Sequence, residues 1–192
     1  MCIRDSIGTG RVVNRSGDDV ELEVAIDGHP PPALPLTLIL ALPRPKVLNR
    51  VIAGVASMGV KRIYLINAWR VEKSYWKSPR LAHFDEQAIL GLEQARDTML
   101  PRIEMRRLFR PFVEEELPGI THGTRALVAH PRASKPCPHD VPEPITLAIG
   151  PEGGFIDEEI ASLERVGFEA VTVGPRILRV ETAVAAILGR LF

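Results

Sequence analysis

The chain has 192 residues with 24 basic and 24 acidic side chains, so its formal net charge is zero. Hydrophobic residues make up 45% and charged residues 25% of the sequence, which is typical of a globular protein and excludes a disordered or collagen-like chain. No apolar run approaches the roughly 18 residues that cross a bilayer, so we expect no membrane partner. The two cysteines, Cys2 and Cys137, form no CxxC pattern, which favours a cytoplasmic protein without a disulfide framework or a metal.

The first part of the chain favours a small β-structure. Residues 11–26 contain two hydrophobic stretches around a polar turn, the second with strict alternation, which predicts a β-hairpin. A single hairpin is only marginally stable, so this one should belong to a small β-domain or lean on the rest of the chain. The proline-rich stretch 29–35 predicts a linker. We therefore divide the chain into an N-terminal β fragment with its linker at 1–32 and a larger domain at 33–192.

After the linker, predicted strands alternate with predicted helices. Hydrophobic runs predict strands at 36–42, 62–67, 103–108, 125–129, 145–149 and 170–173. Helices are predicted at 47–58, 84–97, 157–167 and 181–192, the third of them capped by the carboxylate of Asp157. The last helix is almost wholly apolar, which suits a buried core or a subunit interface. The alternation implies an α/β fold with a mostly parallel sheet and helices on both faces.

Two turns that join a strand to a helix carry unusual residues. The turn 149–155 holds three glycines, which let a backbone approach a ligand closely. The segment 173–183 places Arg179, Glu181 and Thr182 at the head of an apolar helix. Ligands of parallel α/β folds bind in such turns, beyond the carboxyl ends of the strands. Neither turn matches a dinucleotide or P-loop motif, and either one alone would fit a purely structural role.

Charge is unevenly distributed along the chain although it sums to zero. Between residues 44 and 80 many basic residues accompany a single acidic one, Glu72, and Trp69, Tyr75 and Trp76 lie among them. Such a stretch attracts a polyanion, and aromatic rings can stack on bases. A solvated basic face with aromatic side chains that merely pack is the alternative. The candidate RNA contacts are Arg44, Lys46, Arg50, Arg70, Lys73 and Arg96.

Four short segments follow one another in an informative order. They are MGVKRI at 58–63, LEQAR at 92–96, IGPEGGF at 149–155 and GPRILRVETA at 174–183. Together they resemble the knotted (SPOUT) methyltransferases, and more narrowly the bacterial ribosomal RNA small subunit methyltransferase E family. The resemblance extends over about residues 36–192. It implies a trefoil-knotted α/β fold that binds S-adenosyl-L-methionine and methylates N3 of a uridine in small-subunit (16S) ribosomal RNA.

The resemblance also implies which residues form the site. The candidate cofactor contacts are His130, Ile149, Gly150, Pro151, Gly153, Val173, Gly174, Ile177, Leu178, Arg179 and Thr182. N3 of uracil is a poor nucleophile until its proton leaves, so a base or a stabilising cation is required. We expect Arg179 to stabilise the developing negative charge and Glu181 to orient Arg179 or to accept the proton. A pair of these two residues that only holds the fold closed is the alternative.

Members of this family are homodimers in which the second subunit completes each site, and they begin with a β-barrel of the PUA type that grips RNA. We therefore expect the segment 1–32 to be a truncated PUA-like fragment, and the opening residues 1–6 match no expected start. The implied partners are the small-subunit ribosomal RNA or the 30S particle and a second copy of the chain. A catalytically silent RNA-binding protein and a small-molecule-binding α/β protein are the alternatives.

Overall fold

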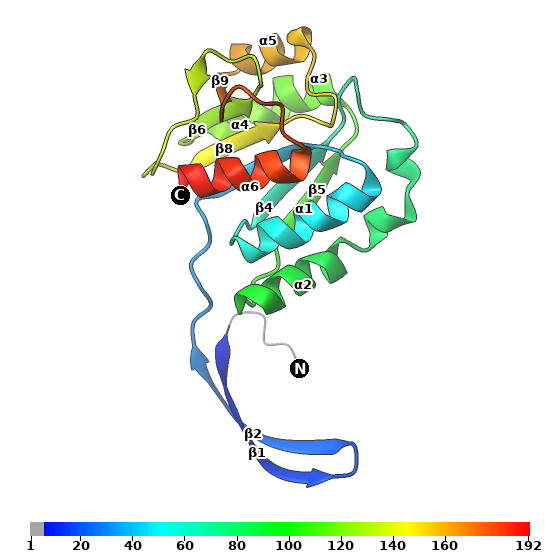
Figure 1. Cartoon of the computed structure of the whole chain (residues 1–192), viewed down its shortest axis with the longest axis vertical. Coiled ribbons are helices and arrows are strands. Elements are labelled where there is room, and N and C mark those ends of the chain that lie inside the picture. Colours follow the sequence, from blue (N-terminus) through cyan, green and yellow to red (C-terminus); the bar gives the residue numbers. More distant parts are fainter. Residues whose placement is uncertain (1–5) are drawn as a thin grey trace.

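The computed structural model describes residues 6–192, which form two separate sheets (Figure 1). The first is an antiparallel hairpin of β1 (Ile7–Ser16) and β2 (Asp19–Gly28), which confirms the predicted hairpin. It projects away from the main body, and its hydrophobic side chains, such as Val12 and Leu22, are exposed. Cys2 lies outside the described residues. Within residues 6–192, no helix is long and apolar enough to span a membrane.

The second sheet has seven strands in the order β5-β4-β3-β8-β6-β9-β7, and all its pairings are parallel. Its strands are β3 (Leu36–Ala41), β4 (Arg62–Ile66), β5 (Arg102–Arg106), β6 (Arg125–Ala129), β7 (Lys135–Pro136), β8 (Ile145–Ile149) and β9 (Glu169–Thr172). The mostly parallel sheet and its six predicted strands are confirmed. The two-residue strand β7 was not predicted, because so short a segment has no hydrophobic periodicity.

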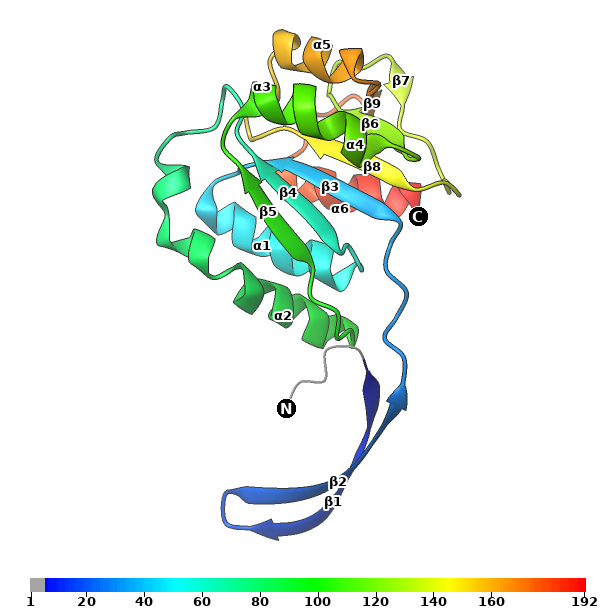
Figure 2. The same ribbon diagram turned by 180° about the vertical axis from the view of Figure 1, so that it is seen from behind.

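Helices cover both faces of this sheet, as predicted. The helices α1 (Pro45–Ser57), α2 (Phe84–Ala95) and α6 (Val180–Leu191) lie on one face, and α4 (Leu117–Thr121) and α5 (Asp157–Arg165) lie on the other (Figures 1 and 2). Every residue of the central strands β3 and β8 is buried, which explains their continuous apolar sequences. The end of α6 lies against the β7–β8 connection, where the Val141 N–H donates to the Leu191 carbonyl at 2.8 Å.

The start of α5 differs from the prediction. Asp157 does not cap the helix: it is exposed at the first helical position, and Ile156 occupies the N-cap. The carboxylate that reaches the N-cap belongs to Glu159, whose Oε2 accepts the Ile156 N–H at 3.0 Å. A side chain at the third helical position lies within reach of the N-cap backbone, whereas one at the first position points outward.

Residues 67–83 and 109–121 form short helical segments that the sequence did not predict. The first stretch holds two 3₁₀ turns, η1 (Tyr75–Lys77) and η2 (Pro79–Ala82). The second holds α3 (Phe109–Pro111), the π-helical η3 (Phe112–Glu116) and α4. Pro118 resembles a helix breaker, yet it lies at the start of α4 directly after the π-helical η3. Phe112 and Leu117 are buried, so tertiary packing stabilises this segment more than its intrinsic helix propensity.

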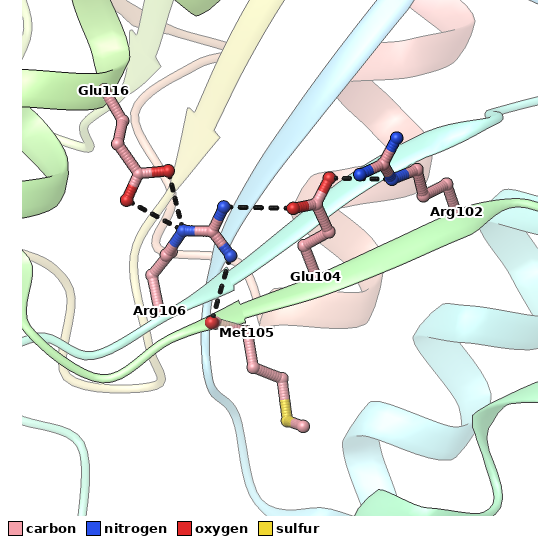
Figure 3. A network of polar contacts seen from close by, with 5 residues as sticks. All are labelled: Arg102, Glu104, Met105, Arg106 and Glu116. Atoms are coloured by element: carbon pink, nitrogen blue, oxygen red, sulfur yellow. Dashed lines mark hydrogen bonds and ion pairs between the residues drawn. The ribbon is translucent and has the colours of Figure 1, made fainter.

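Arg106 ties the edge strand β5 to the π-helical segment (Figure 3). Its Nε lies 2.7 Å and 2.8 Å from the two carboxylate oxygens of Glu116, and its Nη2 lies 3.0 Å from Glu104. The guanidinium also lies over the Tyr64 ring, 5.5 Å from its centroid. Both carboxylates raise the pKa of Arg106, so its charge is retained at any accessible pH. The edge of the sheet is thus held by a network of charged groups.

Arg106→Ala is expected to lower the free energy of unfolding by about 2 kcal/mol, because it leaves Glu104 and Glu116 without their shared partner. Urea unfolding followed by circular dichroism measures the change. Arg102→Ala is the matched control, since the Arg102 side chain is 78% exposed and contacts Glu104 alone at 2.9 Å. Its cost should stay below about 1 kcal/mol. Equal losses for the two variants would contradict the special role of Arg106.

Candidate active site

A cavity of about 670 Å³ lies at the carboxyl ends of β6, β8 and β9. Its walls come from three loops, at 129–132, 149–158 and 171–178, and from the first turns of α6. The three loops are far apart in the sequence, but they meet because β6 lies between β8 and β9 in the sheet. Cavities of about 300–1,000 Å³ are typical of small-molecule sites. The structure therefore brings together the two turns that the sequence singled out.

The glycine-rich turn after β8 presents its backbone to the cavity. Gly154 donates its N–H to the Pro151 carbonyl at 2.7 Å and has a φ of 72°, which favours glycine. Gly150 is buried, and a Cβ there would lie 2.8 Å from the Phe155 nitrogen, which is too close for real atoms. A Cβ on Gly153 would lie 2.7 Å from Cδ of Arg70. Close packing thus requires glycine at 150, where the neighbours are backbone atoms, whereas a Cβ at 153 would displace the Arg70 side chain.

The other two loops are held to each other by backbone contacts. The His130 N–H donates to the Val171 carbonyl at 2.9 Å, which joins the loop after β6 to β9. Gly174 has a φ of 148°, and its carbonyl accepts a hydrogen bond from Thr172 Oγ1 at 3.0 Å. Ile177 is 82% exposed although it lines the cavity, so it forms part of the rim. The cavity therefore has walls of hydrogen-bonded backbone and an exposed apolar side chain, Ile177, at its rim.

Most of the candidate cofactor contacts line the cavity. They are His130, Ile149, Gly150, Pro151, Gly153, Val173, Ile177 and Leu178. The structure does not place Gly174, Arg179 or Thr182 among the lining residues, although Gly174 lies between two of them. Their contacts with a cofactor stay predictions.

Several lining residues escaped the sequence analysis. Arg70 comes from the segment after β4, more than 50 residues before the nearest other wall, and only the folded chain shows its position. Ala183 and Ile187 come from α6, where they resemble ordinary core residues. Asp157 and Glu158 add carboxylates to the rim, where the sequence suggested only a helix start. Proximity across the sheet, rather than any local motif, assembles this part of the site.

The two candidate catalytic residues have different surroundings. Arg179 is exposed at the N-cap of α6, between Leu178 and Val180, which both line the cavity. Glu181 is partly buried, and its Oε1 lies 3.4 Å from Nη2 of Arg50 on α1. The structure therefore gives Glu181 an ion-pair partner other than the expected Arg179. Arg179 itself is exposed and is not among the residues that line the cavity.

Five of the candidate RNA contacts lie, like the cavity, at the carboxyl ends of the strands. Arg44, Lys46 and Arg50 are exposed at the start of α1, and Arg70 and Lys73 are exposed in the segment after β4. Arg96 lies elsewhere. It ends α2 with a φ of 54°. Because α2 runs back toward the amino ends of the strands, Arg96 lies at that end of the sheet, away from the cavity. The structure does not bring Arg96 together with the others.

The aromatic residues of this basic segment divide into two kinds. Trp76 donates its indole N–H to Asn67 Oδ1 at 2.9 Å, and Arg107 lies 5.6 Å from its ring centroid. Tyr75 donates its hydroxyl to Glu72 Oε1 at 3.1 Å, and partial burial raises its pKa. These two side chains support the packing interpretation. Trp69 differs, since 79% of its surface is exposed.

Comparisons with known proteins identify the family to which the chain belongs. The family model of the RNA methyltransferase domain matches residues 30–191. Ribosomal RNA small subunit methyltransferase E of Treponema pallidum is 35% identical over 162 residues, which cover 79% of this chain and 59% of that protein. The protein of the same name from Mesomycoplasma hyopneumoniae is 27% identical over 176 residues, covering 90% and 76%. The chain thus spans 59% of the length of the Treponema relative.

Solved structures of methyltransferases have the same fold as this chain. Ribosomal RNA small subunit methyltransferase E from Neisseria gonorrhoeae, bound to S-adenosyl methionine, has a TM-score of 0.72 and 27% identity, covering 96% of this chain and 77% of that one. The SpoU methyltransferase AviRb from Streptomyces viridochromogenes shares the fold alone, with a TM-score of 0.55, 17% identity and coverage of 87% and 66%. The predicted fold class is confirmed: the chain belongs to the RNA methyltransferase domain family and has the α/β-knot fold of the SPOUT methyltransferases.

Proposed function

We propose that the protein uses S-adenosylmethionine to methylate N3 of a uridine in small-subunit (16S) ribosomal RNA. The observation that carries this proposal is the single cavity formed by the three loops at the carboxyl ends of β6, β8 and β9. It is supported by a similar protein, the Neisseria enzyme, which is bound to S-adenosyl methionine. A reaction on ribosomal RNA belongs in the bacterial cytoplasm, where ribosomes are found.

The residues that line the cavity fit such a cofactor. Apolar side chains of Ile149, Val173 and Leu178 suit the carbon skeleton of a nucleoside, and the close-packed glycine turn offers backbone groups to its polar atoms. The lining carries carboxylates such as Asp157 and Glu158 as well as arginines such as Arg132, so it offers partners for both the positive and the negative groups of the cofactor. When bound, the sulfonium cofactor supplies an electrophilic methyl group. The chain itself has to hold the acceptor base in line and remove its proton.

Arg179 is the residue that we propose for charge stabilisation. Its side chain is exposed next to the cavity-lining segment, so a uracil ring at the entrance would be within its reach. A cation beside the ring favours loss of the N3 proton and stabilises the anion that forms. Glu181, held by Arg50, is the candidate for orienting the base or accepting the proton. In this scheme Arg50 fixes Glu181, and Arg179 acts on the base.

The RNA is proposed to lie on the basic edge formed by Arg44, Lys46, Arg50, Arg70 and Lys73. In ribosomal RNA or the 30S particle, the backbone phosphates would contact these cations, and the target uridine would reach the cavity beside them. We propose that the segment 1–32, which holds the projecting hairpin, is a PUA-like fragment that makes a separate RNA contact. Because the hairpin is separate from the main sheet, it can contact RNA without altering the cavity.

Removing two of these cations should reduce the salt dependence of RNA binding. Each phosphate contact to a single strand contributes about −0.7 to the slope of log K against log salt, so Lys46→Ala with Lys73→Ala should lower the slope's magnitude by about 1.4. Filter binding to in vitro transcribed 16S ribosomal RNA across a salt series gives the slope. Arg96→Gln, at the opposite edge of the sheet, serves as control and should leave it unchanged. If Arg96→Gln reduced the slope and the double variant did not, the RNA would lie instead at the amino ends of the strands.

We further propose that the protein acts as a homodimer through the outer face of α6. That face exposes the small residues Thr182, Ala185, Ala186 and Gly189, while the inner face packs into the core. Small residues let two helices approach closely. Sedimentation equilibrium should give twice the chain mass of 21.2 kDa, and Ala186→Arg should reduce it to the mass of one chain. A wild-type protein that sediments as a single chain would disprove the dimer.

The reaction is tested with small ribosomal subunits from a bacterium that lacks the modification. Purified protein and S-adenosylmethionine carrying a radioactive methyl group are added, and the modified base is mapped by mass spectrometry. We expect one methyl group on N3 of one uridine. Methylation of another base would disprove the uridine assignment. RNA binding without any methyl transfer or cofactor binding would favour the silent RNA-binding protein.

A further inference from the structure

Glu159 is a buried carboxylate that joins two parts of the chain. Only 7% of this residue is exposed. Its Oε1 accepts the Trp69 N–H at 2.7 Å, and its Oε2 accepts the Ile156 N–H at 3.0 Å. A buried charge is costly unless such hydrogen bonds satisfy it. The carboxylate therefore fixes the segment after β4 against the start of α5.

Two further contacts connect the same parts of the molecule. Arg70 donates from Nη1 to the carbonyl of Gly153, in the glycine-rich turn of the cavity. The Arg44 N–H donates to Glu152 Oε1 at 2.8 Å, in the same turn. The basic edge and the cavity wall thus meet at three points. A shift of the basic edge therefore alters its contacts with the cavity wall, and a shift of the wall alters them too.

Trp69 lies at this junction with its ring exposed. Its backbone is fixed by Glu159, its neighbour Arg70 lines the cavity, and 79% of its own surface faces solvent. Neighbouring Trp76 is by contrast held by Asn67 and Arg107. An exposed indole beside an arginine is a stacking surface for an unpaired base, and such stacking tolerates any base. This position would hold a nucleotide next to the target.

Resting on the proposed function, we propose that Glu159 is a positioning residue that couples RNA binding on Trp69 to cofactor binding in the cavity. RNA stacked on Trp69 restricts the motion of the segment after β4. Through its two hydrogen bonds, the Glu159 carboxylate then restricts the motion of the turn that holds the cofactor. Cofactor in the cavity orders the same contacts from the other side. The two ligands therefore strengthen each other's binding by the same factor, as linkage requires.

The test measures this factor with and without the carboxylate. The dissociation constant for in vitro transcribed 16S ribosomal RNA is determined with and without S-adenosylhomocysteine, for the wild type and for Glu159→Gln. Glutamine offers one acceptor oxygen where glutamate offers two, so one of the two N–H groups loses its partner. We expect S-adenosylhomocysteine to tighten RNA binding about tenfold in the wild type and less than about twofold in the variant. Glu164→Gln, exposed on the same helix, should keep the tenfold effect.

A variant that binds both ligands with the wild-type factor would overturn the proposal, as would a wild type that shows no coupling. A merely structural Glu159 would lower stability and leave the factor unchanged. If Glu159→Gln does not fold, amide hydrogen exchange of wild-type Trp69 decides: S-adenosylhomocysteine should slow it, and an unchanged rate overturns the proposal. A wild type that does not bind S-adenosylhomocysteine marks instead the failure of the proposed function.

Discussion

Gly150→Ala is expected to weaken binding of S-adenosylmethionine by about 100-fold. The added Cβ would lie 2.8 Å from the Phe155 nitrogen and 3.1 Å from the Gly154 carbonyl carbon, both of them backbone atoms that cannot rotate away. The turn must therefore shift, and it lines the cavity on both sides of Gly150. A shift that loses about two hydrogen bonds between the turn and the ligand, at roughly 1.4 kcal/mol each, weakens binding about 100-fold. Isothermal titration calorimetry measures the affinity.

Gly54→Ala is the matched control for this substitution. Gly54 is exposed on α1, and its added Cβ would meet nothing within 4 Å. Alanine favours a helix interior, so stability should rise by up to about 1 kcal/mol while cofactor affinity stays unchanged. Circular dichroism establishes that both variants are folded. Tight cofactor binding by folded Gly150→Ala would mean that the glycine turn does not form the cofactor site.

Arg179→Ala is expected to lower kcat about 100- to 1,000-fold and to change cofactor affinity by less than about twofold. Arg179 is exposed, and the cavity lining does not include it, so the chain should fold and bind cofactor without it. Loss of one group that stabilises an anionic transition state costs about this much. Methyl transfer to saturating small ribosomal subunits under single-turnover conditions separates this effect from RNA binding.

Two other variants decide between charge stabilisation and packing at Arg179. Arg179→Lys keeps the positive charge and should recover part of the lost rate, although an ammonium group lacks the planar fork of a guanidinium. Arg165→Ala, exposed near the end of α5, should leave the rate unchanged. Normal methyl transfer by Arg179→Ala with cofactor bound would rule out the catalytic role. The expected pairing with Glu181 is already replaced by the contact between Glu181 and Arg50.

Much of the fold could be predicted from the sequence, because hydrophobic periodicity is a local property. The continuous apolar sequences of β3 and β8 indicate strands buried on both sides, and their ends agree with the structure to within one residue. The segment 109–121 could not be predicted in this way. Its helical turns are short and include Pro111 and Pro118, and they are stabilised by burial of side chains such as Phe112 against the sheet.

The candidate site was predictable where it depends on turns and was hidden where it depends on distant contacts. Gly150 and Gly153 stand out because a glycine-rich turn between a strand and a helix is a recognisable pattern. Arg70 had been assigned to RNA alone, and nothing local shows that it reaches Gly153, 83 positions later. Glu159 looked like one of three acids in a first helical turn, and only the folded chain shows its contact with Trp69. Sheet order creates both contacts.

A crystal structure of the protein grown with S-adenosylhomocysteine tests the central claim most directly. We expect the ligand in the cavity bordered by His130, the turn 150–154 and the segment 173–178, in contact with their backbone groups. Ligand density at another position, such as the shallower hollow near Leu34 and Arg62 at the opposite edge of the sheet, would contradict the account. A crystal grown with S-adenosylhomocysteine in which the cavity holds only solvent would also contradict it.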